Sequence, residues 1–148
     1  MRLPFCKLSP IMKKIIALFF LALAVRCVAA DGVAAFRNGL QAFQTNGPDA
    51  LLRSWYDSND QAKIETIRAR LVKATQGFGE VVDTEVFAPK SIGKHIQRLY
   101  GVIYFSEHPL WIRAEYYTIN GRGGFLSMEF SRDADDILPL EIGVAGGG

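Results

Sequence analysis

Apolar residues recur at steps of three and four after residue 31, which is the spacing of one face of a helix. The first stripe consists of Val33, Phe36, Leu40 and Phe43. Asn46-Gly47-Pro48 ends it, and Pro48 suits the first turn of a following helix, where its missing N–H costs no hydrogen bond. A second, short helix is therefore predicted, with apolar positions at Leu51, Leu52, Trp55 and Tyr56.

A third helix is predicted to begin at Ser58. Ser58-Asn59-Asp60-Gln61 matches a capping box, in which Ser58 and Gln61 satisfy each other's backbone donors. The apolar stripe of this helix consists of Ile64, Ile67, Leu71 and Ala74. Gly77 fits the left-handed position that ends many helices.

From Gly79 the apolar period becomes two, which is typical of strands. A first strand is expected around Val82 and Val86, followed by strands over residues 94–105, 110–119 and 125–131, with turns at 106–109 and 120–124. Residues 133–138 could form a last helical turn. Helices first and an antiparallel meander afterwards indicate an α+β fold, with N-terminal helices packed on a curved antiparallel four-stranded sheet.

The two faces of the predicted sheet follow from a four-residue turn that pairs Phe105 with Leu110. The next pairs are Ile103 with Ile112, Gly101 with Ala114 and Leu99 with Tyr116. The face assigned to the helices and the core holds Leu99, Ile103, Phe105, Ile112, Ala114, Tyr116, Leu126, Met128 and Phe130. The opposite face holds Tyr100, Val102, Tyr104, Trp111, Arg113, Glu115, Tyr117 and Phe125, half charged and half aromatic.

Residues 1–30 are predicted to be an export signal. Lys13 and Lys14 precede an unbroken apolar run over residues 15–25, and Val28-Ala29-Ala30 offers small residues for cleavage before Asp31. As a helix the run is about 16 Å long, against about 30 Å of bilayer hydrocarbon, so it is too short to span. The mature protein is therefore expected to be periplasmic or secreted by a bacterium, with no membrane attachment after cleavage.

Two alternatives concern this segment. Met12 could be the true start in place of Met1, and Cys27 could be lipidated, although the bulky Arg26 before it disfavours this. Cleavage would remove both cysteines, Cys6 and Cys27, and five of the seventeen basic residues, which leaves twelve against fifteen acidic residues and a net charge of −3. A weakly acidic domain without a cationic cluster lacks the electrostatic footprint for binding nucleic acid.

Motifs for catalysis or metal binding are not evident. His95 and His108 lack the spacing of zinc ligands, and the cluster of Asp133, Asp135 and Asp136 lacks the glycine and downstream Glu of a calcium loop. No serine sits in a Gly-x-Ser-x-Gly elbow. We therefore assign no catalytic, cofactor-binding or metal-binding residue.

Five short stretches carry a more specific likeness. They are Gly77-Phe78-Gly79-Glu80, Arg98-Leu99-Tyr100, Pro109-Leu110-Trp111, Tyr116-Tyr117 and Gly124-Phe125-Leu126-Ser127-Met128-Glu129-Phe130. Together with the order of elements, they resemble the nuclear transport factor 2-like, or cystatin-like, superfamily, and its small exported bacterial members in particular. The resemblance covers residues 33–138 and implies a cone-shaped roll with a pocket between helices and sheet. In some relatives that pocket binds or isomerises small molecules, and in others it is filled and the sheet mediates pairing.

Two classes of function follow. Only Tyr116 offers a polar tip on the inward face, whereas general acid–base chemistry needs a titratable group inside. This favours a non-catalytic module that binds a small apolar ligand or a protein partner, with candidate pocket residues Leu99, Tyr116, Met128 and Phe130. The alternative is an isomerase or lyase in which Tyr116 acts with His95 or Glu115.

The outer face of the sheet is the candidate interface. Its aromatic residues are Tyr100, Tyr104, Trp111, Tyr117 and Phe125, a patch on the order of several hundred Å². We expect this patch to form a homodimer, sheet to sheet. The alternative is that the chain from Leu138 to Val144 folds back and covers it, although residues 139–148 are predicted to be a flexible tail beyond the domain at 31–138.

Overall fold

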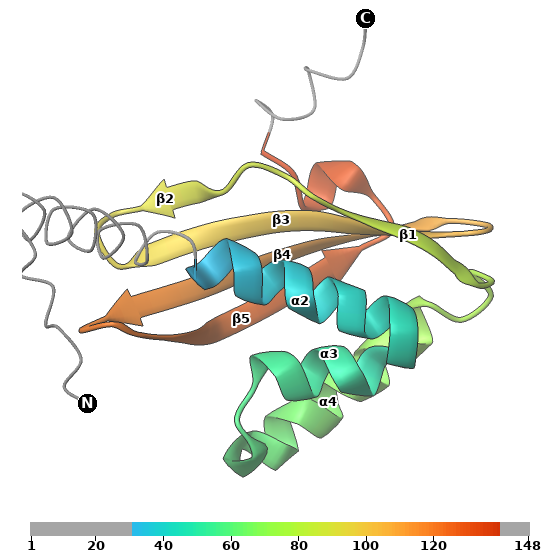
Figure 1. Ribbon diagram of the computed structural model, residues 1–148. Coiled ribbons are helices and arrows are strands. Elements are labelled where there is room, and N and C mark those ends of the chain that lie inside the picture. The colour runs from blue at the N-terminus through green and yellow to red at the C-terminus, as the bar shows by residue number, and fades with distance from the viewer. Residues whose placement is uncertain (1–30, 140–148) are drawn as a thin grey trace, which may run out of the picture. The chain divides into compact units, whose positions relative to one another are not determined.

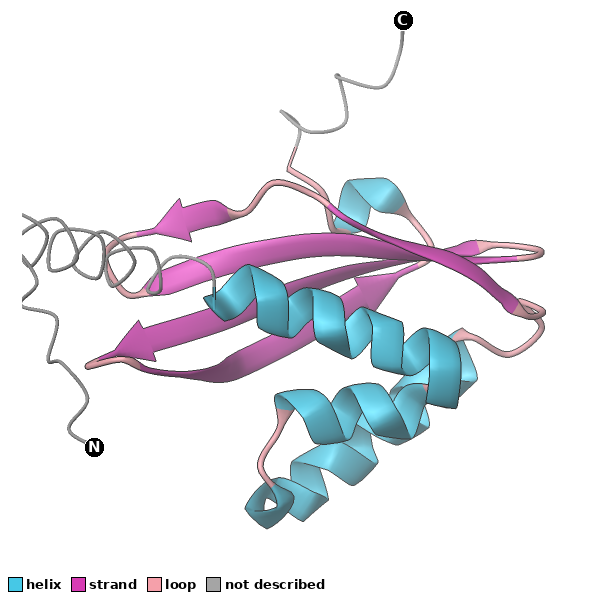
Figure 2. Ribbon diagram, viewed as in Figure 1, coloured by secondary structure: helices cyan, strands magenta, loops and turns pink. Residues whose placement is uncertain are grey.

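Three helices cover one face of an antiparallel sheet (Figures 1 and 2). The computed structural model describes residues 31–139, so the predicted signal peptide and nearly all of the predicted tail lie outside the described residues. The helices are α2 (Asp31–Asn46), α3 (Pro48–Trp55) and α4 (Gln61–Ala74), with a 3₁₀ turn, η1 (Ser58–Asp60), before α4. The predicted α+β class is confirmed.

The sheet contains five strands rather than the four that were predicted. They are β1 (Val81–Val86), β2 (Lys90–Ile92), β3 (Ile96–Phe105), β4 (Pro109–Ile119) and β5 (Arg122–Ser131). The strand order is β1-β3-β4-β5, and β2 also pairs with β3. The sequence does not reveal β2 because its three residues are all exposed and show no apolar alternation. A second 3₁₀ turn, η2 (Ala134–Asp136), follows β5 where a last helical turn was predicted.

The helix boundaries agree with the prediction except at α4, whose start and end both differ. Asp57 caps the start in place of Ser58, because its Oδ1 accepts the backbone N–H of Asn59 at 3.0 Å. Gln61 does not reach back to a capping residue and donates instead to Glu65 Oε1 at 2.8 Å. The capping-box prediction is therefore wrong. A carboxylate accepts a stronger hydrogen bond than a hydroxyl does, which favours Asp57 as the cap. Because Asp57 stands one residue before Ser58, the short turn η1 forms ahead of α4.

The helical stripes supply the core on one side of the sheet. Their buried members are Phe36, Leu40, Phe43, Leu51, Leu52, Trp55, Tyr56, Ile64, Ile67 and Leu71, while Val33 and Ala74 are partly buried against them. α4 ends earlier than predicted, at Ala74 with Thr75 as its C-cap, and Gly77 lies in the turn that follows. Its φ of 81° is in the left-handed region that glycine adopts without steric cost. The apolar spacing thus predicted the buried face of each helix correctly.

Four aromatic rings, which we call the aromatic stack, join the helices to the sheet. Phe36 of α2 stacks on Trp55 of α3 with 5.0 Å between ring centroids, and Trp55 stacks on Phe125 of β5 at 4.5 Å. Tyr116 of β4 meets Phe125 edge to face at 5.0 Å. The Trp55 indole N–H donates to the carbonyl of Ala35 at 3.2 Å. Two helices and two strands are therefore held by one continuous set of ring contacts.

The pairing of β3 with β4 is shifted by two residues from the predicted register. The observed pairs are Ile103 with Leu110, Gly101 with Ile112 and Leu99 with Ala114. The backbone N–H of Phe105 donates to the carbonyl of His108 at 3.2 Å, so the loop between the strands is two residues shorter than predicted. The tip of this hairpin bonds to the loop before β1, through Ser106 to Glu80 and Glu107 to Phe78. Because the shift is even, every residue of β3 and β4 keeps its predicted face.

A β-bulge in β5 overturns two of the face assignments. Glu115 pairs with Ser127 and Tyr116 with Phe125, which leaves Leu126 as an extra residue. Phe125, predicted to face outward, is consequently 8% exposed within the core, and Leu126, predicted to face the core, is 46% exposed. Strict alternation fails here because the bulge reverses the parity of the strand. Met128 remains buried on the helix side, and Phe130 packs partly buried against the core.

Gly39→Ala is expected to destabilise the protein by about 1–3 kcal/mol, as overpacking of a core does. In an exposed helix the same change would stabilise by about 0.5–1 kcal/mol. At this position, however, a Cβ atom would overlap the indole nitrogen of Trp55, which cannot move because Phe36 and Phe125 stack on its two sides. Urea unfolding measures the change, and Gly124→Ala, which adds a Cβ in open space, is the matched control. A Gly39→Ala protein as stable as its parent would contradict the stack.

The bulge is tested by truncating Phe125 and Leu126, one at a time, to alanine. Phe125→Ala should lose about 3–5 kcal/mol, the usual cost of removing a buried aromatic ring. Leu126→Ala should lose less than about 1 kcal/mol, because that side chain is half exposed. Urea unfolding of both variants distinguishes the bulged strand from a regular one, for which the larger loss would fall on Leu126.

Candidate functional site

The residues predicted to line a ligand pocket belong mostly to the core, and Met128 also lines a hollow of about 480 Å³ between α4 and β5, together with Ile67, Arg70 and Leu126. Leu99 and Met128 belong to the buried core, Tyr116 is 7% exposed beneath Phe125, and Phe130 is partly buried at its margin. The fit around Tyr116 is close, since a Cβ atom on Gly123 would overlap its hydroxyl. These four residues share one side of the sheet, as predicted, and their role in binding a ligand stays a prediction.

The three residues considered for an isomerase or lyase lie on both faces of the sheet. Tyr116 points into the core, whereas Glu115 lies on the opposite face and accepts a hydrogen bond from Arg98 at 2.7 Å. His95 precedes β3; its Nδ1 lies 3.0 Å from the carbonyl oxygen of Thr118, and its ring centroid lies 6.2 Å from that of Tyr117 on the outer face. Tyr116 and Glu115 are therefore not placed to share one substrate.

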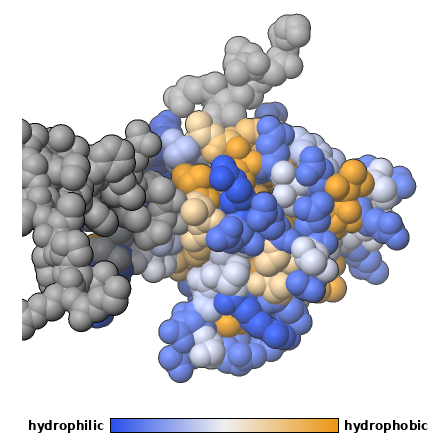
Figure 3. Space-filling view, viewed as in Figure 1, coloured by the Kyte–Doolittle hydropathy of each residue, from blue (hydrophilic) through white to orange (hydrophobic). Residues whose placement is uncertain are grey.

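The outer face of the sheet carries four of the five predicted interface residues. Tyr104, Trp111 and Tyr117 are partly buried there, and Tyr100 is only 1% exposed. Phe125 is the exception, because the bulge turns it into the core. Figure 3 shows the side that carries α2, where apolar residues form separate small patches between polar ones. The outer face differs in bringing its aromatic residues together on adjacent strands.

Two ion pairs run across the strands of this face. Arg98 of β3 lies 2.7 Å from Glu115 of β4, and Arg113 of β4 pairs with Glu129 of β5. The hydrogen bond to Glu115 raises the pKa of Arg98 above its ordinary value, although burial opposes this. Pairs between neighbouring strands on one face typically contribute about 0.2–1 kcal/mol each. They also leave this part of the face with paired rather than excess charge.

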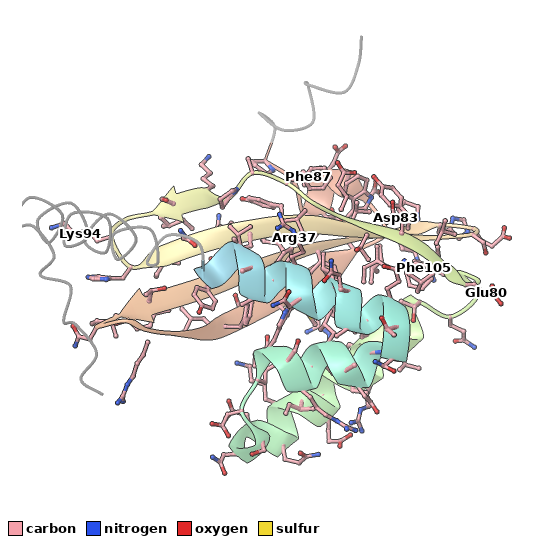
Figure 4. All side chains as sticks on the ribbon, in the orientation of Figure 1. Arg37, Glu80, Asp83, Phe87, Lys94 and Phe105 are labelled. Carbon is pink, nitrogen blue, oxygen red and sulfur yellow. The ribbon has the colours of Figure 1, made fainter. Side chains whose placement is uncertain are left out.

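Residues outside the predicted interface complete the face. Phe87, just after β1, stacks on Trp111 with 6.0 Å between ring centroids, and Figure 4 shows it on the side of β3 away from α2. Tyr104 donates to Glu85 of β1 at 2.9 Å, and burial, followed by this hydrogen bond, raises the pKa of Tyr104. Alternation along β1 puts Glu85 and Phe87 on one side. Only the pairing of β1 with β3 shows that this side is the outer one.

The chain after β5 passes on the outer side of the sheet. Figure 1 shows η2 on the side opposite α2, α3 and α4, and Asp136 of η2 accepts a hydrogen bond from Ser131 at 2.7 Å. Ile137 directly after η2 is 3% exposed, and Val102 on the outer face of β3 is fully buried. The predicted fold-back from Leu138 to Val144 lies mostly outside the described residues. The described members of this segment, Leu138 and Pro139, are partly buried, and Ile137, one position before the segment, is the buried apolar residue.

A separate cavity of about 420 Å³ lies between α3 and α4. It is lined by Arg53, Tyr56, Ser58, Gln61, Ile64 and Arg68. The Tyr56 hydroxyl is buried and has no hydrogen-bond partner among the described residues. Burial, followed by the charge of Asp60, raises the pKa of Tyr56 to about 12. This polar cavity was not predicted, since Tyr56 reads in the sequence only as the last apolar position of a helix.

No known family model, curated protein or solved structure matches this chain. Over residues 31–139, no three His, Cys, Asp or Glu side chains gather in a way that could hold a metal ion. The helices described in that range are also too short or too polar to cross a membrane. The candidate site therefore rests on the geometry of the outer face and of the α3–α4 cavity.

The raised pKa of Tyr56 predicts how stability changes at high pH. The folded protein holds the phenol proton up to about pH 12, whereas an unfolded chain releases it near pH 10. Tyr56 therefore contributes stability that is fully present below about pH 10 and is lost as the pH rises toward 12. A Tyr56→Phe variant should lose less stability over this interval and should lack the latest step in the ultraviolet titration of tyrosinate. Tyr117→Phe is the control and should retain that step.

Proposed function

We propose that this chain is an exported, non-catalytic binding module with a nuclear transport factor 2-like roll, which pairs with a second copy of itself through the outer face of its sheet. Support for the roll comes from the order of the elements and from helices packed on one face of an antiparallel sheet. The export part of the proposal rests on the sequence of residues 1–30 alone.

The arrangement around Trp111 is the observation that carries the pairing. Trp111 stacks on Phe87, with Tyr104 on the neighbouring strand β3 and the Arg113–Glu129 ion pair between β4 and β5 on the same face. Aromatic residues and arginine are enriched at protein interfaces, where they supply apolar contact together with specific hydrogen bonds.

A protein partner fits the geometry better than a small apolar ligand or a substrate does. The aromatic stack and the surrounding core pack closely around Tyr116, which leaves little space for a ligand beside that ring. Tyr116 and Glu115 lie on opposite faces of the sheet, which weighs against their acting together in an isomerase or lyase. Both observations favour a binding surface over a catalytic site.

The size of the face indicates a weak dimer. Strands lie about 4.8 Å apart and rise about 3.3 Å per residue, so β3, β4 and β5 are about 33–36 Å long and the shorter β1 is about 20 Å. Together they give a face on the order of 600 Å². Tyr100 and Val102 are already buried within one chain and add little new contact. Stable dimers bury about 800 Å² on each partner, and smaller interfaces are typical of transient pairs. The dimer should therefore dissociate on dilution.

Trp111→Asp is expected to abolish the pairing without unfolding the monomer, because it places an unpaired charge at the centre of the interface. Analytical ultracentrifugation over a series of concentrations measures the association, and circular dichroism checks the fold. Val72→Asp is the control, since Val72 lies on α4, on the other side of the sheet, and is 53% exposed. A parent protein that stays monomeric at every concentration would refute the pairing, as would equal dissociation by both variants.

A further inference from the structure

β5 forms an edge of the sheet beside α4. It pairs only with β4 among the described strands, and Figure 1 shows it on the side of the sheet where α4 lies. Residues of an edge strand alternately direct their backbone N–H and C=O groups toward the neighbouring strand and away from it. Leu126 has one such outward carbonyl, which accepts a hydrogen bond from the Lys63 ammonium of α4 at 3.0 Å. The edge of β5 can therefore accept a further strand.

Three contacts show that α4 runs alongside β5 in the same direction. The contacting pairs, in chain order, are Lys63 with Leu126, Arg70 with Phe130, and Ala74 with Arg132. About 16 Å of helix thus accompanies about 20 Å of strand. The hollow of about 480 Å³ lies between these two elements, and Leu126, which is 46% exposed, forms part of its wall. We call this hollow the α4–β5 groove.

The residues that line the α4–β5 groove, among those the structure describes, include two cations and no carboxylate. Lys63 and Arg70 are both exposed, and neither forms an ion pair with another described residue. Their contacts are a carbonyl oxygen and two aromatic rings, which leave both charges uncompensated. Arg132, at the far end, likewise contacts a carbonyl oxygen and an aromatic ring. The sequence does not reveal this row of cations, because its members come from two distant segments.

We propose that the α4–β5 groove binds an extended acidic segment of a partner protein as an added strand. Backbone hydrogen bonds would form along residues 127–131, which pair regularly with β4 beyond the bulge. Carboxylates at alternate positions of the segment would face Lys63 and Arg70, which lie about 10 Å apart along the helix. An N–H of the segment would replace the Lys63 ammonium at the Leu126 carbonyl, which frees the ammonium to bind a carboxylate.

A second copy of this chain or a nucleic acid fits the groove less well. Pairing of two β5 edges would bring two rows of cations together, and like charges repel. A nucleic acid offers phosphates to the cations but has no backbone N–H groups to pair with a strand edge. Trp111 and the other aromatic residues of the outer face do not line the groove, so this proposal does not rest on the pairing proposed above.

The peptide Ac-Glu-Val-Glu-Val-Glu-NH₂ is a suitable probe. NMR titration of the ¹⁵N-labelled protein at low salt should show saturable shifts of the amides of residues 126–130. At saturation, hydrogen exchange of the outward amides of β5 should slow at least about 5-fold, because an added strand covers them. The same peptide with lysine in place of glutamate should bind at least about 10-fold more weakly.

Two methylated peptides test whether the segment pairs as a strand. One carries N-methyl groups on its glutamate amides, and the other carries them on its valine amides. An added strand donates to β5 from only one of these two sets. One methylated peptide should therefore bind at least about 5-fold more weakly than the other, and equal binding of the two would contradict strand addition.

A double variant tests the assigned charges. Lys63→Gln with Arg70→Gln should weaken the glutamate peptide at least about 5-fold. The matched control is Arg37→Gln with Lys94→Gln, which removes the same charge from exposed positions on α2 and in the turn between β2 and β3 (Figure 4). This control should change the affinity less than about 2-fold.

Three results would overturn the site. The first is the absence of saturable shifts at residues 126–130 in the parent protein. The second is an equal loss of affinity in both double variants, which would show only general attraction to positive charge. The third is a dimer that persists in Trp111→Asp and dissociates when the peptide is added, since a second copy would then occupy the edge. Otherwise Trp111→Asp should bind the peptide as tightly as the parent does, whether or not the outer face forms a dimer.

Discussion

The contact that holds the two layers together is the position of Trp55 between Phe36 and Phe125. Its indole touches a helix on one side and a strand on the other, and its N–H is satisfied by the Ala35 carbonyl. α2 can approach this closely because Gly39 has no side chain at the point of contact. The aromatic stack thereby sets the distance between α2, α3 and the sheet, and it brings Phe125 against Tyr116.

Because core side chains pack closely around Tyr116, the outer face of the sheet is the better candidate for a binding site. β3 is buried on both faces at its centre, since Leu99 and Ile103 meet the helices while Tyr100 and Val102 are covered on the other side. Such a strand resembles the middle of a sandwich more than the surface of a two-layer domain. The outer face is therefore only partly available, and what remains around Trp111, Tyr104 and Tyr117 suits a small, reversible contact.

The outer face combines aromatic area with charges that already neutralise each other, so its contribution to binding comes from shape and desolvation. The α3–α4 cavity has no part in that contact, because its lining residues belong to the helical layer on the other side of the sheet (Figure 1).

The sequence by itself determined the helices, most of the strands and the buried face of each helix. A packed helix or strand has one continuous apolar side, which repeats every 3.6 residues in a helix and every two in a strand. The spacing of Phe36, Leu40 and Leu71 therefore predicted their burial without information on which residues they contact. It also placed Tyr104, Trp111 and Tyr117 on the outer face, because an even error in register leaves parity unchanged.

Only the tertiary structure decided the features that depend on which segments meet. The register of β3 with β4 is supported by backbone hydrogen bonds to Phe78 and Glu80, which are far from the turn in sequence. The bulge exchanges Phe125 and Leu126, and the ring of Phe125 completes the stack on Trp55. The buried hydroxyl of Tyr56 likewise follows from the packing of α4 against α3. Apolar periodicity predicts whether a residue is buried. Which residues surround it depends on how distant segments of the chain pack together.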